Sequence, residues 1–438
     1  MLLTINKDLP SPKNLPVVTQ AELNKALDHH TMFLRGQIGG QRAILQYKNL
    51  SHLDFYDRDL SHADFTGSML AHADLSLGIY KCACFFACDM TNADLSHSDF
   101  SRSDLRGSYL AGANMSGTNL TDADMREGKI MEKDTKGGLV NRLRTGGEGT
   151  KTILTGARLT NANLSNVRAN SADFTDANLS GANISDAHFS QSIFQGANLT
   201  NTDFTGTDLS KTTMTNAILL GTIMTDTERP SLKNTHAITD KALGERIEDH
   251  EETLEELLKK HGLWIKTAGQ EGQQLNLSNY DLRNATDLNL LPLTAIRATD
   301  ACFLGMDLCH VSMQSTVLDR SDFRDCYMEN VDLRGSSLKK VKMTRVILRG
   351  ARLSPLHFGN GEKNNARLRR VDLSGSDLRF SNLQDIDLRD AILMDVDLSH
   401  ADLTGADLRR ADLTGAILKN TCLDGANLKD TIIDLGNV

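Results

Sequence analysis

The feature that most constrains this chain is a repeat of five residues. One unit, Ala-Asp-Leu-x-x, is written three times in succession between Ala401 and Gly415. A period of five matches neither the helical period of about 3.6 residues nor the two-residue alternation of a plain β-strand. The backbone must therefore turn a corner in every unit, and such a repeat fixes the architecture before any other pattern is considered.

The apolar centre of the unit recurs in three long blocks. These blocks run from Phe55 to Ile130, from Leu154 to Met224 and from Phe303 to Ile433. A small residue, most often alanine, usually stands two places before the centre. The repeat therefore covers most of the chain.

This pattern resembles that of the pentapeptide-repeat family. The resemblance implies an all-β solenoid, a right-handed quadrilateral β-helix with one unit on each side and four units in each coil. It also implies that the centre and the small residue point inward and that residues twenty apart stack on one face. Several phenylalanine pairs have this spacing, and we interpret them as core packing. They are Phe65 with Phe85, Phe174 with Phe194, and Phe303 with Phe323.

Two non-repetitive segments divide the chain into tandem modules, each with a capping helix followed by coils. A helix at the start of a solenoid would cover apolar side chains and an unpaired sheet edge. The predicted parts are an N-terminal arm and capping helix at 1–42, a first solenoid at 43–230 with a loop insertion at 131–150, a linker and second capping helix at 231–274, and a second solenoid at 275–438.

Both capping helices have recognisable signals. The first is predicted to begin at Thr19, with Glu22 completing a capping box. The second is predicted to run from about Thr239 to His261, with Gly262 as its stop. We interpret His30 and His261 as hydrogen-bonded cap residues rather than catalysts. The inward pattern appears twice, 231 residues apart, as Leu23, Leu27 and His30 and as Leu254, Leu258 and His261.

Two insertions interrupt the solenoids. The segment 131–150 breaks the five-residue phase, and long loops without regular structure are often functional. The segment from Gly359 to Asn365 keeps the phase but places Lys363 where a leucine is expected. We expect one side of this coil to bulge outward.

Composition and termini indicate the cellular setting. The chain has 438 residues, a net charge of −9 and seven cysteines, an odd number. The first residues contain no signal-peptide pattern, and no apolar run is long enough to span a membrane. These observations predict a cytoplasmic, reducing environment.

Residue types that often carry chemistry occur here in places that the repeat explains. Cys82 and Cys84 should face out while Cys88 faces in, so the three cannot converge on a metal ion. His52 and His72 should stack on one face, and two histidines make a weak metal site. A ladder of outward aspartates in the last coils has no pocket to perturb its pKa values. The sequence therefore predicts no catalytic residue, no cofactor and no metal site, and the chain is not expected to be an enzyme.

The most unusual charge feature is a basic belt in the second solenoid, in which Glu362 is the only acid. Its cations are Lys339, Lys340, Lys342, Arg345, Arg349, Arg352, Lys363, Arg367, Arg369 and Arg370. We expect all but Lys363 to point outward, in a band that could dock an acidic protein face, a lipid surface or nucleic acid. Because no aromatic residues interleave with the cations, direct binding of single-stranded nucleic acid is disfavoured.

The preferred function is a non-enzymatic scaffold or adaptor in a bacterial complex, with a protein partner. Partner-binding residues are predicted in the belt, Lys363 excepted, and in the inserted loop at Lys133, Lys136, Arg142 and Arg144. One alternative, which rests on the family resemblance, is a DNA mimic that binds DNA gyrase and protects it from quinolones. A net charge of −9 is small for such a mimic, since B-DNA carries one charge per about 1.7 Å. A second alternative is a secreted or membrane-associated effector.

Overall fold

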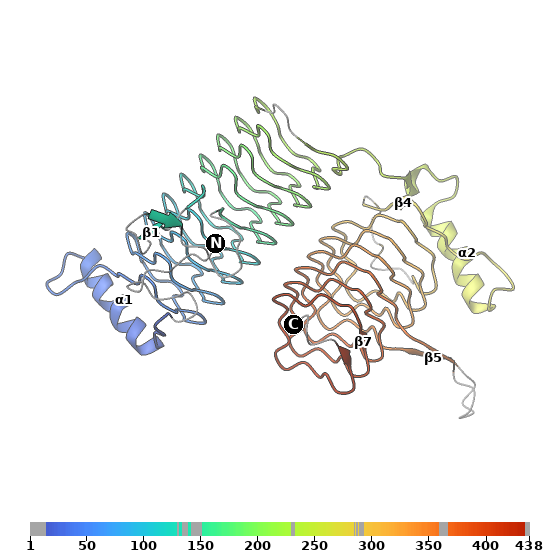
Figure 1. Ribbon diagram of the computed structural model, residues 1–438. Helices are drawn as coiled ribbons and strands as arrows, with labels where there is room; N and C mark the ends of the chain where they lie inside the picture. Colours follow the sequence, from blue (N-terminus) through green and yellow to red (C-terminus); the bar gives the residue numbers. More distant parts are fainter. Residues whose placement is uncertain are drawn as a thin grey trace. The chain divides into compact units, whose positions relative to one another are not determined.

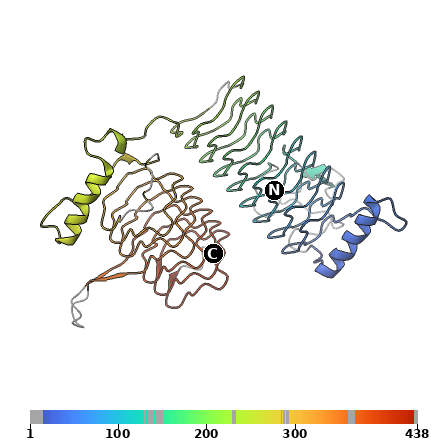
Figure 2. The same ribbon diagram turned by 180° about the vertical axis from the view of Figure 1, so that it is seen from behind.

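The fold was analysed in a computed structural model of the chain. It describes residues 15–128, 131–133, 139–141, 151–228, 233–283, 285, 288, 293–358 and 367–433. The chain forms two compact units, Met1–Asp240 and Lys241–Val438. Figures 1 and 2 show each unit, taken by itself, as a stack of similar coils.

Each coil is joined to the next by backbone hydrogen bonds between residues about twenty apart in sequence. In the first unit Asp54 forms a parallel bridge with Asp74, and Asp74 forms the next bridge with Asp94. The N–H of Leu75 donates to the carbonyl oxygen of Asp94 at 2.6 Å. Four such columns run along each unit, so every coil has four sides. This is the predicted quadrilateral β-helix, and most of its rungs are single bridges rather than longer strands.

The repeat centres fill the interior of each unit. Leu403 and Leu408 are completely buried, and Leu413 is 2% exposed. The rings of Phe65 and Phe85 are nearly parallel, with their centroids 4.6 Å apart. The two other predicted phenylalanine pairs stack in the same way, at 4.8 and 4.5 Å. These distances are close to the usual strand spacing of about 4.7–4.9 Å, and they confirm that the ladders belong to the core.

The corners are turned by the residue two places after each centre, which commonly has a positive φ. Asparagine, aspartate, histidine and glycine are frequent there because they tolerate this region best. Glycine has a second reason at Gly112, where a Cβ would lie 2.2 Å from Oδ1 of Asn92 in the preceding coil. The side chain at one corner therefore rests on bare backbone at the next.

Helix α1, Gln20–Leu34, lies at the start of the first unit (Figure 1). As predicted, Thr19 is its N-cap and forms a capping box with Glu22. Leu23 and Leu27 are buried in the same hydrophobic cluster as the centres of the first coils. The helix is therefore part of the core of this unit.

The residues around the start of α1 satisfy the backbone edge of the first coil. Val17 forms a parallel bridge with Asn49. The side-chain amide of Gln20 bonds both the carbonyl and the N–H of Asp54, at 2.9 Å each. The amide thereby replaces a neighbouring strand, and these edge groups are not left open to pair with another chain.

The second unit begins differently from the helix predicted at 239–261. Helix α2 spans Leu254–Lys266, and its capping box is formed by Thr253 and Glu256. Gly262 lies inside this helix, so the predicted bounds and the predicted stop were wrong. The threonine–glutamate pair determines the start, and the helix continues through Gly262 for one further turn, in which Leu263 and Ile265 are exposed.

The segment before α2 covers the edge of the first coil in this unit. Strand β3, Glu245–Arg246, pairs in parallel with strand β4, Tyr280–Asp281. The 3-10 helix η2, Ile247–Asp249, follows β3, and Ile247 joins the hydrophobic core. Strand β3 therefore plays the part that Val17 plays in the first unit.

The coils of the first unit also continue beyond the predicted boundary at 230. Ile218 bridges with Ile238, and the unit ends at Asp240. The remaining strands form three pairs. They are β1 (Met131–Lys133) with β2 (Leu139–Asn141) and β5 (Leu356–Phe358) with β6 (Arg367–Arg369), both antiparallel, and β7 (Asp412–Leu413) with β8 (Ile432–Ile433), which is parallel.

Candidate functional site

Two antiparallel hairpins leave the coils at corners, and the first contains β1 and β2. Tyr109 bridges with Ile153 instead of a residue twenty positions further on. Leu154 therefore takes the core place that follows Met125, and the chain between these two residues is inserted. Ile130, which the repeat predicts as a core centre, lies outside the described residues. The predicted loop at 131–150 thus contains a short hairpin.

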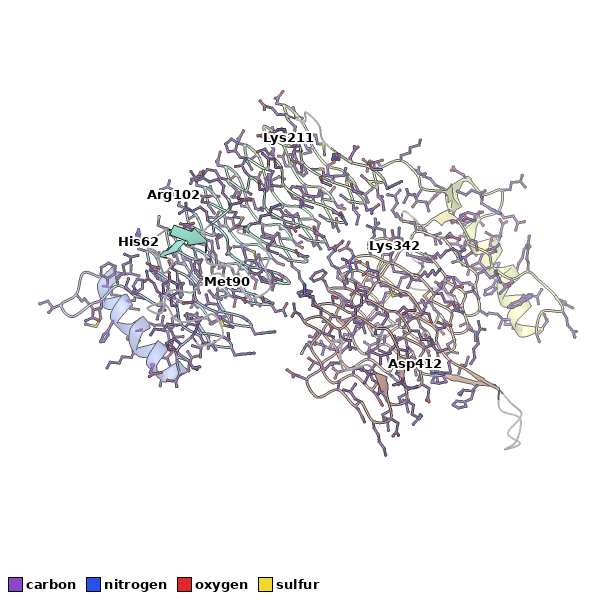
Figure 3. The ribbon with its side chains drawn as sticks, viewed as in Figure 1. His62, Met90, Arg102, Lys211, Lys342 and Asp412 are labelled. Atoms are coloured by element: carbon purple, nitrogen blue, oxygen red, sulfur yellow. The ribbon has the colours of Figure 1, made fainter. Side chains whose placement is uncertain are left out.

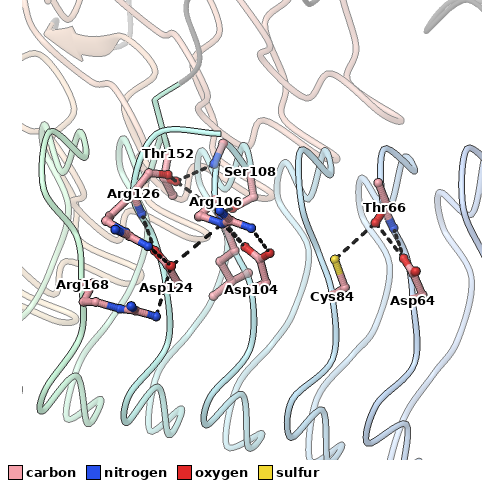
Figure 4. A network of polar contacts seen from close by, with 12 residues as sticks. Asp64, Thr66, Cys84, Asp104, Arg106, Ser108, Asp124, Arg126, Thr152 and Arg168 are labelled. Carbon is pink, nitrogen blue, oxygen red and sulfur yellow. Dashed lines mark hydrogen bonds and ion pairs between the residues drawn. The ribbon is translucent and has the colours of Figure 1, made fainter. Parts of the chain in front are cut away.

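An arginine–aspartate network lies on the side of the solenoid from which this hairpin leaves (Figure 4). Asp124 accepts a hydrogen bond from Arg126 at 2.8 Å, and its carboxylate lies 3.2 Å from the guanidinium of Arg168. Arg106 lies 3.9 Å from Asp124 and 2.7 Å from Asp104. Because these residues come from three successive coils, the network joins the coils before and after the insertion.

The contacts hold these groups in their charged forms. Burial raises the pKa of Asp124, but hydrogen bonds from Arg126 and the charge of Arg168 outweigh it, so the pKa lies below the ordinary value of 3.8. The hydrogen bond that Arg106 donates to Asp104 raises the pKa of the guanidinium. The network is therefore a set of fixed ion pairs, without the pKa near neutrality that an acid–base catalyst needs.

One hydroxyl and two glycines close the base of the first hairpin. Oγ1 of Thr152 accepts a hydrogen bond from the N–H of Gly107 at 3.0 Å. The same oxygen lies 3.2 Å from the carbonyl oxygens of Leu105 and Arg126. Gly107 has a φ of 61°, and a Cβ there would lie 2.8 Å from the carbonyl oxygen of Gly128. The base of the hairpin thus rests on bare backbone.

The second hairpin, formed by β5 and β6, leaves a corner of the same kind (Figure 1). Ser337 bridges with Asp372, and the inserted residues lie between them. A Cβ on Gly335, whose φ is 67°, would lie 2.8 Å from the Cβ of Leu356 in β5. The bulge predicted on one side of this coil is therefore a two-stranded arm. Lys363 lies outside the described residues.

A second carboxylate held between arginines lies beside this arm. Asp332 pairs with Arg334 at 2.8 Å and with Arg352 at 2.6 Å, and Gln314 donates to it at 2.7 Å. Burial raises the pKa of Asp332, but the bonds from Arg334 and Gln314 bring it below 3.8. Both hairpins therefore leave next to a buried aspartate that is fully paired.

Three cations of the basic belt are paired with carboxylates of neighbouring coils. Arg345, which the sequence predicts to face solvent, is only 9% exposed. Several belt cations have an ion partner within 3.0 Å. The pairs are Lys339 with Asp372, Arg345 with Asp325, and Arg352 with Asp332. The band therefore carries less free charge than a count along the sequence indicates.

Three belt cations that precede the second hairpin keep their charge exposed. Lys340, Lys342 and Arg349 are exposed, and no carboxylate in the described part of the chain forms an ion pair with them. Lys342 is labelled in Figure 3. Arg370 is half-buried and donates to the backbone carbonyl of Asp390 at 2.5 Å.

The other predicted partner-binding residues are described only in part. Arg369 is exposed in β6. Lys133 lies in β1 and Arg367 in β6. Those outside the described residues are Lys136, Arg142 and Arg144.

The aspartates of the repeat stabilise their own turns. Oδ1 of Asp402 accepts from the N–H and the hydroxyl of Thr404, at 3.0 and 2.6 Å. Asp407 accepts from both Nε and Nη2 of Arg409, at 2.8 and 2.6 Å. Each aspartate thus bonds the residue two positions later, as in an Asx-turn, and the ladder has a structural role.

The cysteines and stacked histidines lie where the repeat predicts. Cys82 is exposed, while the buried Cys88 donates its thiol proton to the carbonyl oxygen of Phe65. The rings of His52 and His72 are parallel, with centroids 5.0 Å apart. Across the described residues, no group of three or more His, Cys, Asp or Glu side chains is arranged to hold a metal ion. No helix among them is long and apolar enough to cross a membrane.

Comparison with known families agrees with this architecture. A model described as pentapeptide repeats matches more than half of the sequence. The matched segments are 42–77, 88–126, 152–191, 192–227, 316–354, 364–393 and 391–430. This chain belongs to the pentapeptide-repeat family. Its solved members are right-handed quadrilateral β-helices, and they generally have structural or binding roles rather than enzymatic ones.

Several solved structures are similar to this pentapeptide-repeat protein. HetL from the cyanobacterium Nostoc, which is involved in heterocyst differentiation regulation, is 19% identical; the match covers 91% of this chain and 95% of HetL, with a TM-score of 0.23. QnrB1, a plasmid-mediated fluoroquinolone resistance protein, is 16% identical over 46% of this chain and 86% of its own, with a TM-score of 0.29. A protein of the Arabidopsis thaliana thylakoid lumen is 26% identical over 32% of this chain and 67% of its own, with a TM-score of 0.13. None of the curated proteins matches the sequence.

Proposed function

We propose that this pentapeptide-repeat protein is a non-enzymatic interaction scaffold of the bacterial cytoplasm, with a protein partner bound at its two hairpins. The observation that carries the proposal is the contrast between faces and hairpins. On the faces, the recurring aspartates already form hydrogen bonds within their own turns and ion pairs with neighbouring arginines. The second hairpin adds the exposed side chains of Leu368 and Arg369 to an otherwise repetitive surface.

The proposed contacts are the cations of the inserted loop and the exposed cations of the belt. Lys340, Lys342 and Arg349 are exposed and retain charge that a partner's carboxylates could neutralise. Arg345 and Arg352 are held by aspartates, so we assign them to positioning the coil beside the second hairpin. A partner with an acidic face fits this distribution best.

Each unit is further proposed to be a separate capped module. Helix α1 and helix α2 pack on the first coils of their own units. In both units an extended segment before the helix pairs with the coil edge. This repeated arrangement supports a duplication in which the helix closes the start of the solenoid.

The test removes a contact surface without disturbing the solenoid. Replacing 357–368 by a two-residue turn should leave the circular dichroism and the melting temperature nearly unchanged, because β5 and β6 pair with each other. Partner recovery by affinity purification and mass spectrometry should then fall sharply. The charge reversals Lys340→Glu, Lys342→Glu and Arg349→Glu should weaken recovery in a salt-dependent way. Unchanged recovery in both variants would sink the proposal.

The matched control for the charge reversals is Arg320→Glu. Arg320 is exposed and pairs with Asp300 at 2.5 Å, so its reversal changes the net charge as much as each single reversal does, without touching an unpaired cation. We expect partner recovery to be almost unaffected. An equal loss in this variant would show that net charge, rather than the exposed cations, controls binding.

Mimicry of DNA is not favoured by the arrangement of charges. Asp387 and Asp407 lie in one column of the second unit, and each is paired with an arginine of its own turn, Arg389 or Arg409. Such a column is close to neutral, whereas B-DNA carries one negative charge per about 1.7 Å. A gyrase supercoiling assay with and without a quinolone separates the two functions. A scaffold should leave supercoiling and its inhibition unchanged.

A further inference from the structure

The histidines of the two helices occupy equivalent buried positions. His30 in α1 and His261 in α2 are completely buried. Nδ1 of His30 accepts a hydrogen bond from the N–H of Ala43 at 3.0 Å, and Nδ1 of His261 accepts one from Leu275, also at 3.0 Å. In both units this N–H lies at the start of the first coil. In both units, Nδ1 of the histidine therefore links the helix to the start of the solenoid.

The contact requires a neutral ring. A backbone N–H can only donate, so Nδ1 must carry a lone pair and the single ring proton must be on Nε2. In the second unit Nε2 donates to the carbonyl oxygen of Thr294 at 2.8 Å. A second proton, placed on Nδ1, would set one N–H group against another across 3.0 Å. Protonation therefore removes the contact and replaces it with repulsion.

The surroundings of His30 do not favour the charged ring enough to offset its burial. Burial lowers the pKa below the ordinary value of 6.5. The backbone of Ser61 and the carboxylate of Asp59 act in the opposite direction, while the charges of Arg42 and His62 act with burial. All four groups lie in the first coil or directly before it.

The surroundings of His261 are simpler. Burial lowers its pKa below 6.5, and the backbone of Thr294 opposes this. No charged side chain of the described residues contributes to the shift. Both histidines thus resist protonation near neutral pH, because protonation of Nδ1 requires the loss of the hydrogen bond that it accepts.

We propose that α1 and α2 are acid-sensitive latches, each closed by one neutral histidine and released when that histidine takes up a proton. Leu23 and Leu27 of α1 belong to the core of the first unit. Leu254 and Leu258 of α2 pack against the core of the second. Release therefore uncovers an apolar solenoid end while the coils beyond it stay folded. This control is independent of which partner the hairpins bind.

The sign of the pH dependence follows from the depressed pKa values. The unfolded helix binds a proton below about pH 6.5 while the closed latch does not, so closure is fully favourable above that pH and weakens as the pH falls. Each latch should open up to tenfold more often per pH unit below 6.5. The range from pH 7.5 to 5.0 separates this effect from ordinary carboxylates, which titrate near pH 4.

The second unit carries a natural reporter of its latch. Trp264 is the only tryptophan of the chain, and its ring stacks on His261 with centroids 5.7 Å apart. In the full-length protein we expect its emission to move to longer wavelength, and its quenching by acrylamide to rise, as the pH falls from 7.5 to 5.0. The far-ultraviolet circular dichroism should change little, because α2 has only 13 residues.

The decisive variant is His261→Asn, since asparagine Oδ1 can accept the same N–H bond but does not titrate. Its emission should stay constant over the pH range. The matched control is His310→Asn, an exposed corner residue with a φ of 63°, and it should behave as the wild type. Hydrogen exchange of α2 peptides, corrected for the intrinsic rate, gives a second readout in the unmodified chain.

The first unit allows an independent repeat. Phe33 stacks on His30 with centroids 5.7 Å apart, as Trp264 does on His261. In the double variant Phe33→Trp, Trp264→Phe the emission reports α1, and His30→Asn should abolish its acid response. His62→Asn is the control, because it removes a nearby imidazole but leaves the latch. Emission and exchange that stay unchanged down to pH 5.0, or an acid response that persists in the His30→Asn and His261→Asn variants, would overturn the proposal.

Discussion

Replacing Gly335 by alanine tests how the second hairpin is seated on the solenoid. Gly335 has a φ of 67°, and a Cβ there would lie 2.8 Å from the Cβ of Leu356, closer than two such carbons approach in practice. Gly305 is the matched control, because its φ is 71° and a Cβ there would meet nothing within 4 Å. Both substitutions impose the same backbone strain, but only Gly335→Ala presses on the hairpin.

The expected magnitudes follow from these two contributions. A left-handed conformation costs an alanine about 1–2 kcal/mol, and Gly305→Ala should lower the free energy of unfolding by that amount. Overpacking adds about 1–3 kcal/mol, so Gly335→Ala should cost about 2–5 kcal/mol. The difference between the two variants measures the contact between hairpin and coil.

The assay is urea unfolding followed by far-ultraviolet circular dichroism, with the fluorescence of Trp264, which belongs to the second unit, as a second probe. Limited proteolysis of the hairpin provides a local readout, and only Gly335→Ala should speed cleavage there. Equal free energies of unfolding for the two variants would refute the reasoning. The hairpin would then not rest on the bare backbone of Gly335.

Three further predictions concern side chains of the first unit. Tyr80→Phe should raise the unfolding free energy by about 1–3 kcal/mol, because the buried hydroxyl has no hydrogen-bond partner among the described residues. A lower melting temperature of the variant would show that the hydroxyl is hydrogen-bonded in the wild type. Asp124→Ala should cost about 1.5–3 kcal/mol. The control is Asp122→Asn, which breaks an exposed pair with Arg102 but keeps a residue that tolerates the φ of 59°, and it should cost less than about 1 kcal/mol. Equal costs in urea unfolding would argue against the network. The folded-state pKa of Asp124 is depressed, so its contribution to stability is present above pH 3.8 and is lost as the pH falls below that value. The difference in melting temperature between wild type and Asp124→Asn should therefore shrink only in that acidic range. A difference that shrinks near neutral pH would contradict the assignment.

The core could be predicted from the sequence because the period of five leaves few alternatives. Leu403 and Leu408 had to point inward once their spacing was known, and the phenylalanines twenty apart had to stack. The start of α1 was equally readable, since Thr19 and Glu22 form a capping box on local contacts alone. These features depend on residues close in sequence or on a fixed register.

Features that depend on contacts between coils were missed. Part of the belt's charge is neutralised by other coils. Arg345, for example, pairs with Asp325, which lies twenty residues earlier and outside the belt. Comparing each cation with the residue twenty positions away would have found this pair. The bounds of α2 were missed because Gly262 suggested a stop, whereas the helix continues through this glycine to Lys266.

The hairpins had a signal that was available but not used. Gly107 and Gly335 occupy corners in the coils just before the two insertions, and both make room for the hairpin base. A glycine at the corner twenty residues before a break in the repeat therefore indicates an insertion that folds back over the coil. No comparable local pattern in the sequence identifies the partner.

The register of twenty residues can be measured directly with cysteine pairs. The rings of His52 and His72 lie 5.0 Å apart, so His52→Cys with His72→Cys places two thiols in adjacent coils, at a strand spacing that disulfides can bridge. In the control, His52→Cys with Asp57→Cys, the thiols are closer in sequence but lie on successive corners. After mild oxidation of the folded protein, mass spectrometry should find a 52–72 link and no 52–57 link. A 52–57 link, or no 52–72 link, would contradict the four-sided coil on which the whole account depends.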